Sequence, residues 1–209
     1  MPVNYVVRAD VIDIRTDTPQ PTDEFLVDTN VWYWLVYTRA AMGSSPPRTR
    51  QLTDYPTYVN QALANASRMR QCGLTLSELA HRIEQTEREI YGQSTGAQPP
   101  PTKEFRHNLP TQRTNVVSEV QAAWIQVTAM ASSIDVMLND AMTNAAVLRF
   151  QTEALDGYDL FLLEASRASG IVQVITDDGD FCGVPGIQMF TRNQAVLAAA
   201  QNQGHLIVR

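Results

Sequence analysis

The sequence predicts an α/β fold with a mainly parallel central sheet. Residues 25–27 are a short, continuous apolar run, and residues 171–175 and 187–190 are apolar except for one glutamine each, which is typical of strands buried on both faces. Segments with helical spacing of apolar residues separate these runs. Because parallel neighbours need a crossover connection, alternating strands and helices favour a parallel sheet.

Composition supports a globular chain with a sizeable core. The 209 residues are 44% hydrophobic and 18% charged, within the usual range for such proteins. No apolar run reaches the roughly 18–20 residues of a membrane span, and the charged N-terminus lacks the apolar core of a signal peptide. We therefore expect a cytoplasmic protein that does not enter a membrane. Cys72 and Cys182 form no disulfide framework or zinc motif and are expected to be buried.

The N-terminal part divides at residue 24. Residues 1–24 are predicted to be an extension that adds a strand or hairpin, followed by a linker containing Pro19 and Pro21. The main domain then covers residues 25–209. Its first strand, residues 25–27, ends at Asp28, and residues 40–54 form a loop. A helix is predicted to start at the N-cap Thr53 and to end at Gly73.

The middle of the chain is predicted to carry an insertion at about residues 92–131. Before it, residues 74–76 suggest a short strand, and Ser77 can cap a helix that continues to Ile90. Residues 92–110 contain a triple proline and are expected to have little regular structure and to stand clear of the core. From Val117 to Leu148 the apolar spacing favours one long helix. The alternative is a helix, a strand at residues 134–138, and a second helix capped by Asn139 or Asp140.

The last third shows the clearest pattern. A helix begins at Asp159 and closes at Gly170, and the strand at residues 171–175 runs directly into three acids, Asp177, Asp178 and Asp180. The strand at residues 187–190 and a helix over residues 193–201 follow.

Carboxylates are predicted to gather at one edge of this sheet. Asp28 follows a strand, Glu78 and Asp159 lie in first helical turns, and the three late acids follow the strand at residues 171–175. The carboxyl ends of parallel strands share one edge, where α/β proteins bind ligands. Neighbouring carboxylates repel each other, whereas Mg²⁺ or Mn²⁺ prefers oxygen ligands. Helix capping remains the simpler explanation for Glu78 and Asp159 taken singly.

Five segments resemble the PIN domain, a family of metal-dependent ribonucleases that includes toxins of bacterial toxin–antitoxin pairs. Residues 25–31 (FLVDTNV) resemble its opening signature, and residues 74–79 (LTLSEL) its second acidic segment. Residues 134–138, 155–163 and 175–181 are similar to its third strand and its third and fourth acidic segments. The resemblance covers about residues 25–91 and 132–200, and it favours the helix, strand, helix alternative.

The resemblance implies a three-layer α/β/α fold and a set of metal ligands. These ligands would be Asp28, Glu78, Asp159 and Asp178, with Asp177 and Asp180 competing for the last role and Asp156 a weaker substitute for Asp159. Thr29, Asn30 and Thr176 would orient carboxylates or metal-bound water.

The function implied is a Mg²⁺- or Mn²⁺-dependent ribonuclease that cleaves single-stranded RNA with a metal-activated water. The alternative is a non-catalytic PIN-like module that binds RNA or protein. An antitoxin or another protein could be a partner. The apolar stripe around Trp124 is compatible with core packing and also with the interface of a homodimer. The candidates for phosphate contacts are Arg39, Arg48, Arg50, Arg106, His107 and Arg113, all of which could also be solvated loop residues.

Overall fold

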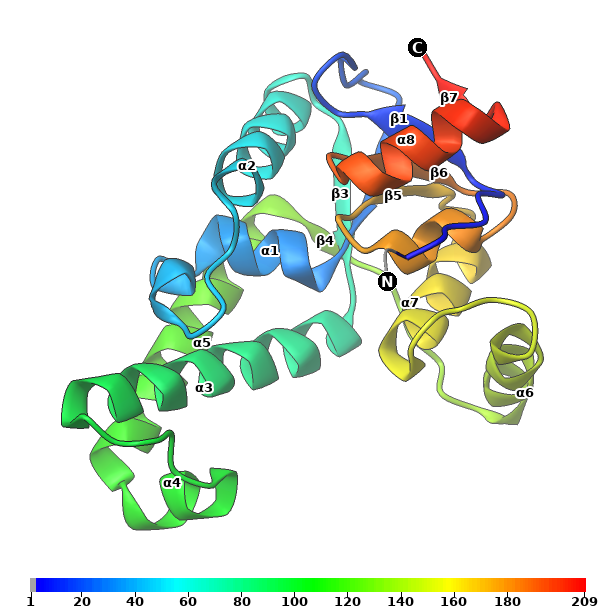
Figure 1. The fold of residues 1–209 in the computed structure, drawn as a ribbon. Coiled ribbons are helices and arrows are strands. Elements are labelled where there is room, and N and C mark those ends of the chain that lie inside the picture. Colours follow the sequence, from blue (N-terminus) through cyan, green and yellow to red (C-terminus); the bar gives the residue numbers. More distant parts are fainter. Residues whose placement is uncertain (1–2) are drawn as a thin grey trace.

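The computed structural model describes residues 3–209 and shows a seven-stranded sheet in which every pair of neighbours is parallel (Figure 1). The order of the strands across the sheet is β4-β3-β2-β5-β6-β1-β7. Their bounds are β1 Asp10–Asp13, β2 Glu24–Val27, β3 Arg68–Gln71, β4 Ser132–Ser133, β5 Gln173–Ile175, β6 Gln188–Thr191 and β7 Leu206–Ile207. The α/β class and the parallel sheet predicted from the sequence are confirmed.

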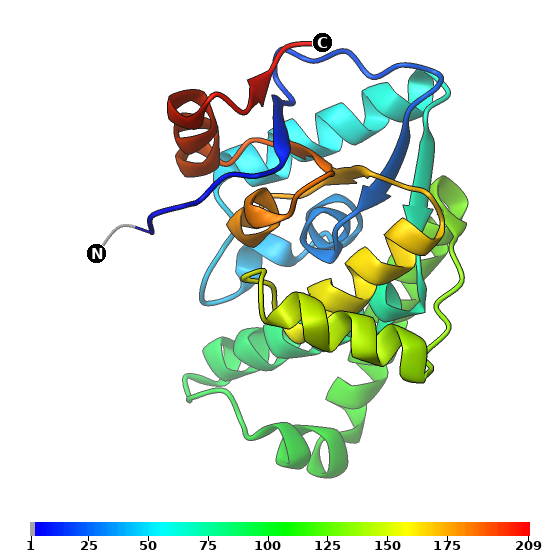
Figure 2. The ribbon, with the colours of Figure 1, turned by 90° about the vertical axis from the view of Figure 1, so that its right-hand side faces the viewer.

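Helices cover both faces of the sheet, which gives the expected three layers (Figures 1 and 2). Successive strand residues point to opposite faces, so Leu26 packs in one core and Phe25 and Val27 in the other. The first core is closed by α6 (Asp140–Phe150), α7 (Gly157–Ala168) and α8 (Gln194–Gln203). The second is closed by α1 (Thr29–Val36), α2 (Thr49–Ala64), α3 (Gly73–Thr95) and α5 (Pro110–Met130). This double burial explains the continuous apolar runs of the central strands.

The chain changes direction in the sheet between β2 and β5. From β2 it moves outward through β3 to β4, and it then returns to β5 and β6 on the other side of β2. The backbone N–H of Asp28 donates to the carbonyl of Ile175 at 3.0 Å, so the ends of these two strands adjoin. In open α/β sheets, ligands bind beyond the carboxyl ends of the strands at such a switch point.

The N-terminal extension contributes a strand to the interior of the sheet. β1 pairs in parallel with β6 on one side and with β7 on the other, which confirms the strand predicted there. Its residues Val11 and Ile12 are fully buried in opposite cores. This strand of the extension is therefore part of the core of the domain.

The inserted segment is more helical than expected. α3 continues to Thr95, and α4 (Thr102–Asn108) follows the prolines, so the prediction of little regular structure over residues 92–110 is wrong at both ends. Phe105 of α4 is fully buried, and the centroid of its ring lies 6.1 Å from that of the Tyr91 ring on α3. This contact packs α4 against α3. The insertion forms an arm of α3, α4 and α5 that extends away from the sheet (Figure 1).

Several predicted boundaries are wrong in the segment before the insertion. α2 begins at Thr49 rather than after Thr53, and Gly73 begins α3 instead of ending the previous helix. The strand predicted at residues 74–76 is the first turn of α3, and the true strand, β3, precedes it. β3 reads Arg-Met-Arg-Gln, and Arg70 is ion-paired to Glu24 on the neighbouring strand β2. It therefore lacks the apolar run by which a buried strand is recognised.

The helix, strand, helix order after residue 110 is confirmed, and the single long helix is excluded. The strand is shorter and earlier than predicted, because β4 comprises only Ser132–Ser133. Asn139 caps α6 by accepting a hydrogen bond from the Met142 N–H at 3.0 Å. Within residues 3–209, no helix has the length and apolar character needed to cross a membrane.

Candidate active site

Asp28 lies where β2 meets α1 and is 2% exposed. Its Oδ2 accepts a hydrogen bond of 2.7 Å from the Thr176 hydroxyl and one of 3.4 Å from the Asn30 amide, and its Oδ1 accepts from the Asn30 N–H at 3.5 Å. Thr176 and Asn30 therefore hold the Asp28 carboxylate as expected. The third expected support, Thr29, makes no such contact, and its buried hydroxyl has no partner among the described residues.

Thr176 also links this carboxylate to the loop after β5. Its hydroxyl oxygen accepts a hydrogen bond from the Asp178 N–H at 2.9 Å. Asp178 in turn caps the short 3-10 helix Gly179–Gly183, because its Oδ1 accepts from the Asp180 N–H at 3.0 Å. A single hydroxyl thus fixes the relative position of Asp28 and Asp178.

Glu78 and Asp159 approach the same region from two helices. Glu78 lies in the second turn of α3 and Asp159 in the first turn of α7. The residue that caps α7 is Asp156, whose Oδ1 accepts from the N–H groups of Tyr158 and Asp159 at 2.9 and 3.1 Å. Helix capping was the simpler explanation for Asp159, but the residue that caps α7 is Asp156.

The four carboxylates are close enough to influence one another. Burial raises the pKa of Asp28 to about 7, and the charges of Glu78 and Asp178 add to the rise while the Thr176 hydrogen bond opposes it. Burial also raises the pKa of Asp159 to about 9, with the charges of Asp28, Asp156, Asp178 and Glu78 adding to it. The charges of Asp28, Glu78, Asp159 and Asp178, which come from four separate segments, thus act on one another; we call these residues the acidic group.

Asp177 and Asp180 lie differently. The Asp177 carboxylate accepts hydrogen bonds from the Tyr55 hydroxyl at 2.7 Å and from the Gln51 amide at 2.5 Å, and so is tied to α2. Asp180 is exposed; partial burial and the charges of Asp178 and Asp156 raise its pKa. Asp177, Asp178 and Asp180 compete for the role of fourth metal ligand. Of these, only Asp178 carries a charge that raises the pKa of both Asp28 and Asp159.

Asp28 and Asp159, the two most buried members of the acidic group, have no neutralising partner within the described residues. Other buried acids in residues 3–209 do: Arg209 pairs with Asp17 and Asp23, Arg39 with Glu87, and two arginines with Glu84. No arginine, lysine or histidine of the described chain forms an ion pair with Asp28 or Asp159. Because burying an unpaired carboxylate is unfavourable, folding alone gives little reason to place them here.

The acidic group fits a hard divalent cation by the chemistry of its donors. All four side chains offer carboxylate oxygens, which Mg²⁺ and Mn²⁺ prefer, and Thr29, the residue after Asp28, has a buried hydroxyl without a partner among the described residues. In residues 3–209, however, no three His, Cys, Asp or Glu side chains are gathered closely enough to form a ready-made metal site. The carboxylates thus interact through their charges but would have to draw closer to share one ion.

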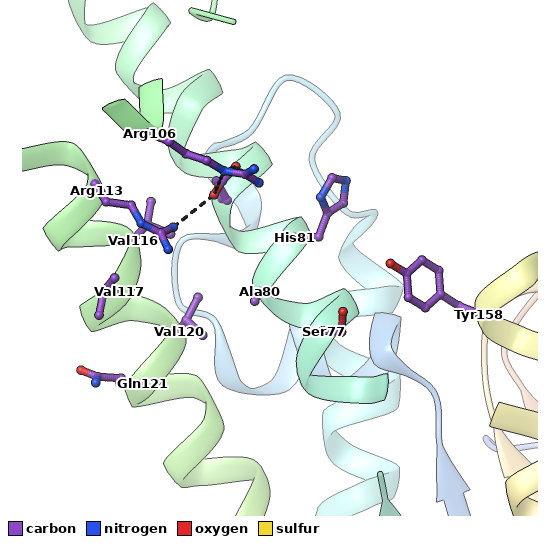
Figure 3. Close-up of a pocket in the computed structure, with 11 residues that line it drawn as sticks. Ser77, Ala80, His81, Arg106, Arg113, Val116, Val117, Val120, Gln121 and Tyr158 are labelled. Carbon is purple, nitrogen blue, oxygen red and sulfur yellow. Dashed lines mark hydrogen bonds and ion pairs between the residues drawn. The ribbon is translucent and has the colours of Figure 1, made fainter. Parts of the chain in front are cut away.

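A groove of about 500 Å³ runs along α3, and the acidic group itself is not part of its lining. Its lining includes Ser77 and Tyr158, the direct sequence neighbours of Glu78 and Asp159. Figure 3 shows α3 along the groove, with residues of α5 on one side of this helix and Tyr158 of α7 on the other. We call it the α3–α5 groove. A second groove, of about 420 Å³, lies between α1, the loop after it and α3, and its lining includes Arg48 and Arg82.

The predicted phosphate-binding residues divide into two groups. Arg39 is paired with the buried Glu87, and Arg106 and Arg113 are paired with Glu84. Arg48 and Arg50 form no ion pair within the described chain, and His107 is exposed.

Sequence reasoning missed Arg82, which lies one helical turn after Glu78. Its guanidinium stacks over the Tyr33 ring at 5.1 Å, and its buried Nε has no hydrogen-bond partner among the described residues. The spacing of four residues from Glu78 was the available signal.

Comparison with protein-family models and with curated protein sequences gives no match.

Proposed function

We propose that this chain is a PIN-like, Mg²⁺- or Mn²⁺-dependent ribonuclease that cleaves single-stranded RNA in the cytoplasm. The observation that carries the proposal is the burial of Asp28 and Asp159 without a cationic partner, at the switch point of a parallel sheet. Every other buried acid in residues 3–209 is paired with an arginine. A bound cation is the simplest source of the missing positive charge.

The residues that would hold the cation are Asp28, Glu78, Asp159 and Asp178, with Asp177 and Asp180 outside the group. When bound, the ion would activate a water molecule and stabilise negative charge on the scissile phosphate. Thr176 and Asn30 keep the Asp28 carboxylate in one orientation, as hydrogen-bonding partners of metal ligands commonly do. Asp156 fixes the first turn of α7 and thereby the position of Asp159.

Arg82 is the residue best placed to bind a phosphate oxygen next to the acidic group. It carries a full charge that no carboxylate in the described chain neutralises, and its stacking on Tyr33 limits its freedom. A guanidinium of this kind can make planar, two-point contacts with phosphate. It would therefore hold the RNA backbone where the negatively charged acidic group alone would repel it.

The proposal is tested by cleavage of a single-stranded RNA that carries a fluorophore and a quencher at its ends. We expect cleavage in MnCl₂ or MgCl₂ and none in EDTA, with loss of at least about 100-fold in Asp28→Asn and Asp159→Asn. Asp10→Asn, which changes an exposed acid on β1, is the matched control and should cleave normally. Cleavage by Asp28→Asn at the wild-type rate in Mn²⁺ would exclude the metal mechanism.

One observation favours the alternative of a non-catalytic module. Five large apolar residues are exposed on α6 and the loop before it, namely Met137, Leu138, Val147, Leu148 and Phe150. Such a patch is typical of a protein-binding surface, and an antitoxin, another protein or a second copy of the chain could cover it. RNA binding by the wild type with no cleavage of any single-stranded RNA would favour this alternative, and sedimentation would show whether the chain forms a homodimer.

A further inference from the structure

The α3–α5 groove combines three features that suit a nucleotide. Its lining has an apolar part made by Val116, Val117 and Val120 of α5, an exposed aromatic ring at Tyr158, and a cationic end (Figure 3). Aromatic rings stack on bases regardless of sequence, and basic groups track the backbone of a single strand. The groove therefore offers separate surfaces for a base and for a phosphate.

The cationic end is built around a buried carboxylate. Glu84, whose side chain is 6% exposed, binds Arg106 at 2.7 Å and Arg113 at 3.2 Å. The two guanidiniums carry one more positive charge than Glu84 neutralises. Only Nη1 of Arg113 is engaged, so its Nε and Nη2 have no partner within the described chain. Because Glu84 holds both guanidiniums in place, little side-chain freedom would be lost when they bind an anion.

One end of the groove is lined by sequence neighbours of the acidic group, and the other end by these arginines. Ser77 and Tyr158 lie at the end near Glu78 and Asp159, and Glu84 lies six residues further along α3. Six residues of α-helix span about 9 Å. A strand whose scissile phosphate lay at the acidic group would thus bring a neighbouring phosphate, one or two nucleotides away, to Arg106 and Arg113.

We propose that the α3–α5 groove is a binding subsite for single-stranded RNA flanking the scissile phosphate. Arg106 and Arg113 bind a backbone phosphate, Tyr158 stacks on one base, and the valine wall of α5, on the other side of α3, packs against another base. This subsite rests on the proposed ribonuclease function, because the acidic group fixes which phosphate is cut. It also gives the inserted segment a role, since α4 and α5 supply both arginines and the apolar wall.

The test is equilibrium binding of a labelled 12-nucleotide single-stranded RNA in EDTA, measured by fluorescence anisotropy at several salt concentrations. Arg113→Ala and Arg106→Ala should each weaken binding about ten-fold. Each should also reduce the slope of log K against log salt by about 0.7, the value for one phosphate contact of a single strand. Val117→Trp, which fills the groove without changing charge, should weaken binding and leave the slope as it is.

Arg68→Ala is the matched control, because Arg68 is also a half-exposed arginine in an ion pair, with Glu24, but lies at the start of β3 at the opposite edge of the sheet. Circular dichroism checks that each variant is folded. If the groove variants bind RNA as Arg68→Ala does, with the same slope, the subsite is excluded.

Cleavage in Mn²⁺, measured in parallel, separates this result from the proposed function. If the groove variants bind RNA more weakly than the wild type but the wild type does not cleave RNA, the subsite is supported and the ribonuclease is excluded. If instead the wild type cleaves RNA and the groove variants bind RNA as well as Arg68→Ala does, the ribonuclease is supported and the subsite is excluded.

Discussion

The Thr176 hydroxyl donates a 2.7 Å hydrogen bond to the Asp28 carboxylate and accepts one of 2.9 Å from the Asp178 N–H. It thereby joins the ends of β2 and β5, the two strands between which the order of the sheet reverses. Two members of the acidic group are positioned by one side chain that carries no charge.

Thr176→Val should keep the shape of this side chain and remove both hydrogen bonds. We expect Mn²⁺ affinity and cleavage to fall about 10- to 100-fold, the usual effect of removing a partner that orients a metal ligand. Thr176→Ser keeps the hydroxyl and should retain most of the activity. Calorimetric Mn²⁺ titration and the RNA cleavage assay measure the two quantities. Equal Mn²⁺ binding by the valine and serine variants would contradict the role assigned to Thr176.

Asp159→Asn should stabilise the protein in EDTA although it abolishes cleavage. Burial and the charges of Asp28, Glu78 and Asp178 raise the pKa of Asp159 to about 9, so at pH 7 folding must protonate this side chain, and asparagine avoids that cost. The gain should be at least about 1 kcal/mol, or roughly 2–4 °C in melting temperature for a chain of this size. Added Mn²⁺ should raise the melting temperature of the wild type more than that of the variant. A variant less stable than Asp10→Asn in EDTA would mean that Asp159 has a purely structural role.

Arg82→Ala should reduce RNA cleavage by at least about ten-fold, because a phosphate contact would be lost beside the acidic group. Arg82→Lys keeps the charge but not the planar guanidinium, and should recover only part of the activity. The control is Arg167→Ala, which removes an exposed arginine that donates to the Pro185 carbonyl before β6, away from the acidic group. Steady-state cleavage rates decide the question, and a wild-type rate in Arg82→Ala would remove this residue from the site.

Arg209→Ala should destabilise the fold by about 3 kcal/mol at pH 7, because it leaves Asp17 and Asp23 buried without a cation. Burial alone would raise the pKa of Asp23, but hydrogen bonds from Arg209, Gln20 and Gln173 lower it below its ordinary 3.8. A lowered pKa in the folded state stabilises the fold above pH 3.8, and this contribution is lost as the pH falls. In urea unfolding, the difference in free energy of unfolding between wild type and variant should therefore become smaller from pH 7 to pH 3. A difference in free energy of unfolding that grew as the pH fell would contradict the pairing of Arg209 with Asp17 and Asp23.

The parts of the fold that were predictable are those whose sequence differs from their surroundings. β2, β5 and β6 were found because both of their faces are buried, which makes most of the residues in each run apolar. β3 was missed because Arg68 and Arg70 alternate with its apolar residue and pair with Glu24. β4, with two serines, has no periodicity to detect.

The acidic group was predictable to a similar degree. Asp28 and Asp178 follow recognisable strands, so the edge they share could be inferred from the parallel order. The ties that hold Asp177 aside come from Gln51 and Tyr55, more than a hundred residues earlier in the chain. Such long-range contacts depend on packing between helices and leave no local pattern. The choice among Asp177, Asp178 and Asp180 therefore needed the three-dimensional structure.

The position of β1 has a consequence for synthesis of the protein. Val11 lies opposite Met189 on β6 and opposite Leu206 on β7, so both neighbours of β1 are synthesised long after it. Such distant pairings form slowly, and until they do β1 is exposed to other chains. The nascent protein must therefore keep β1 unpaired until β6 and β7 have been made.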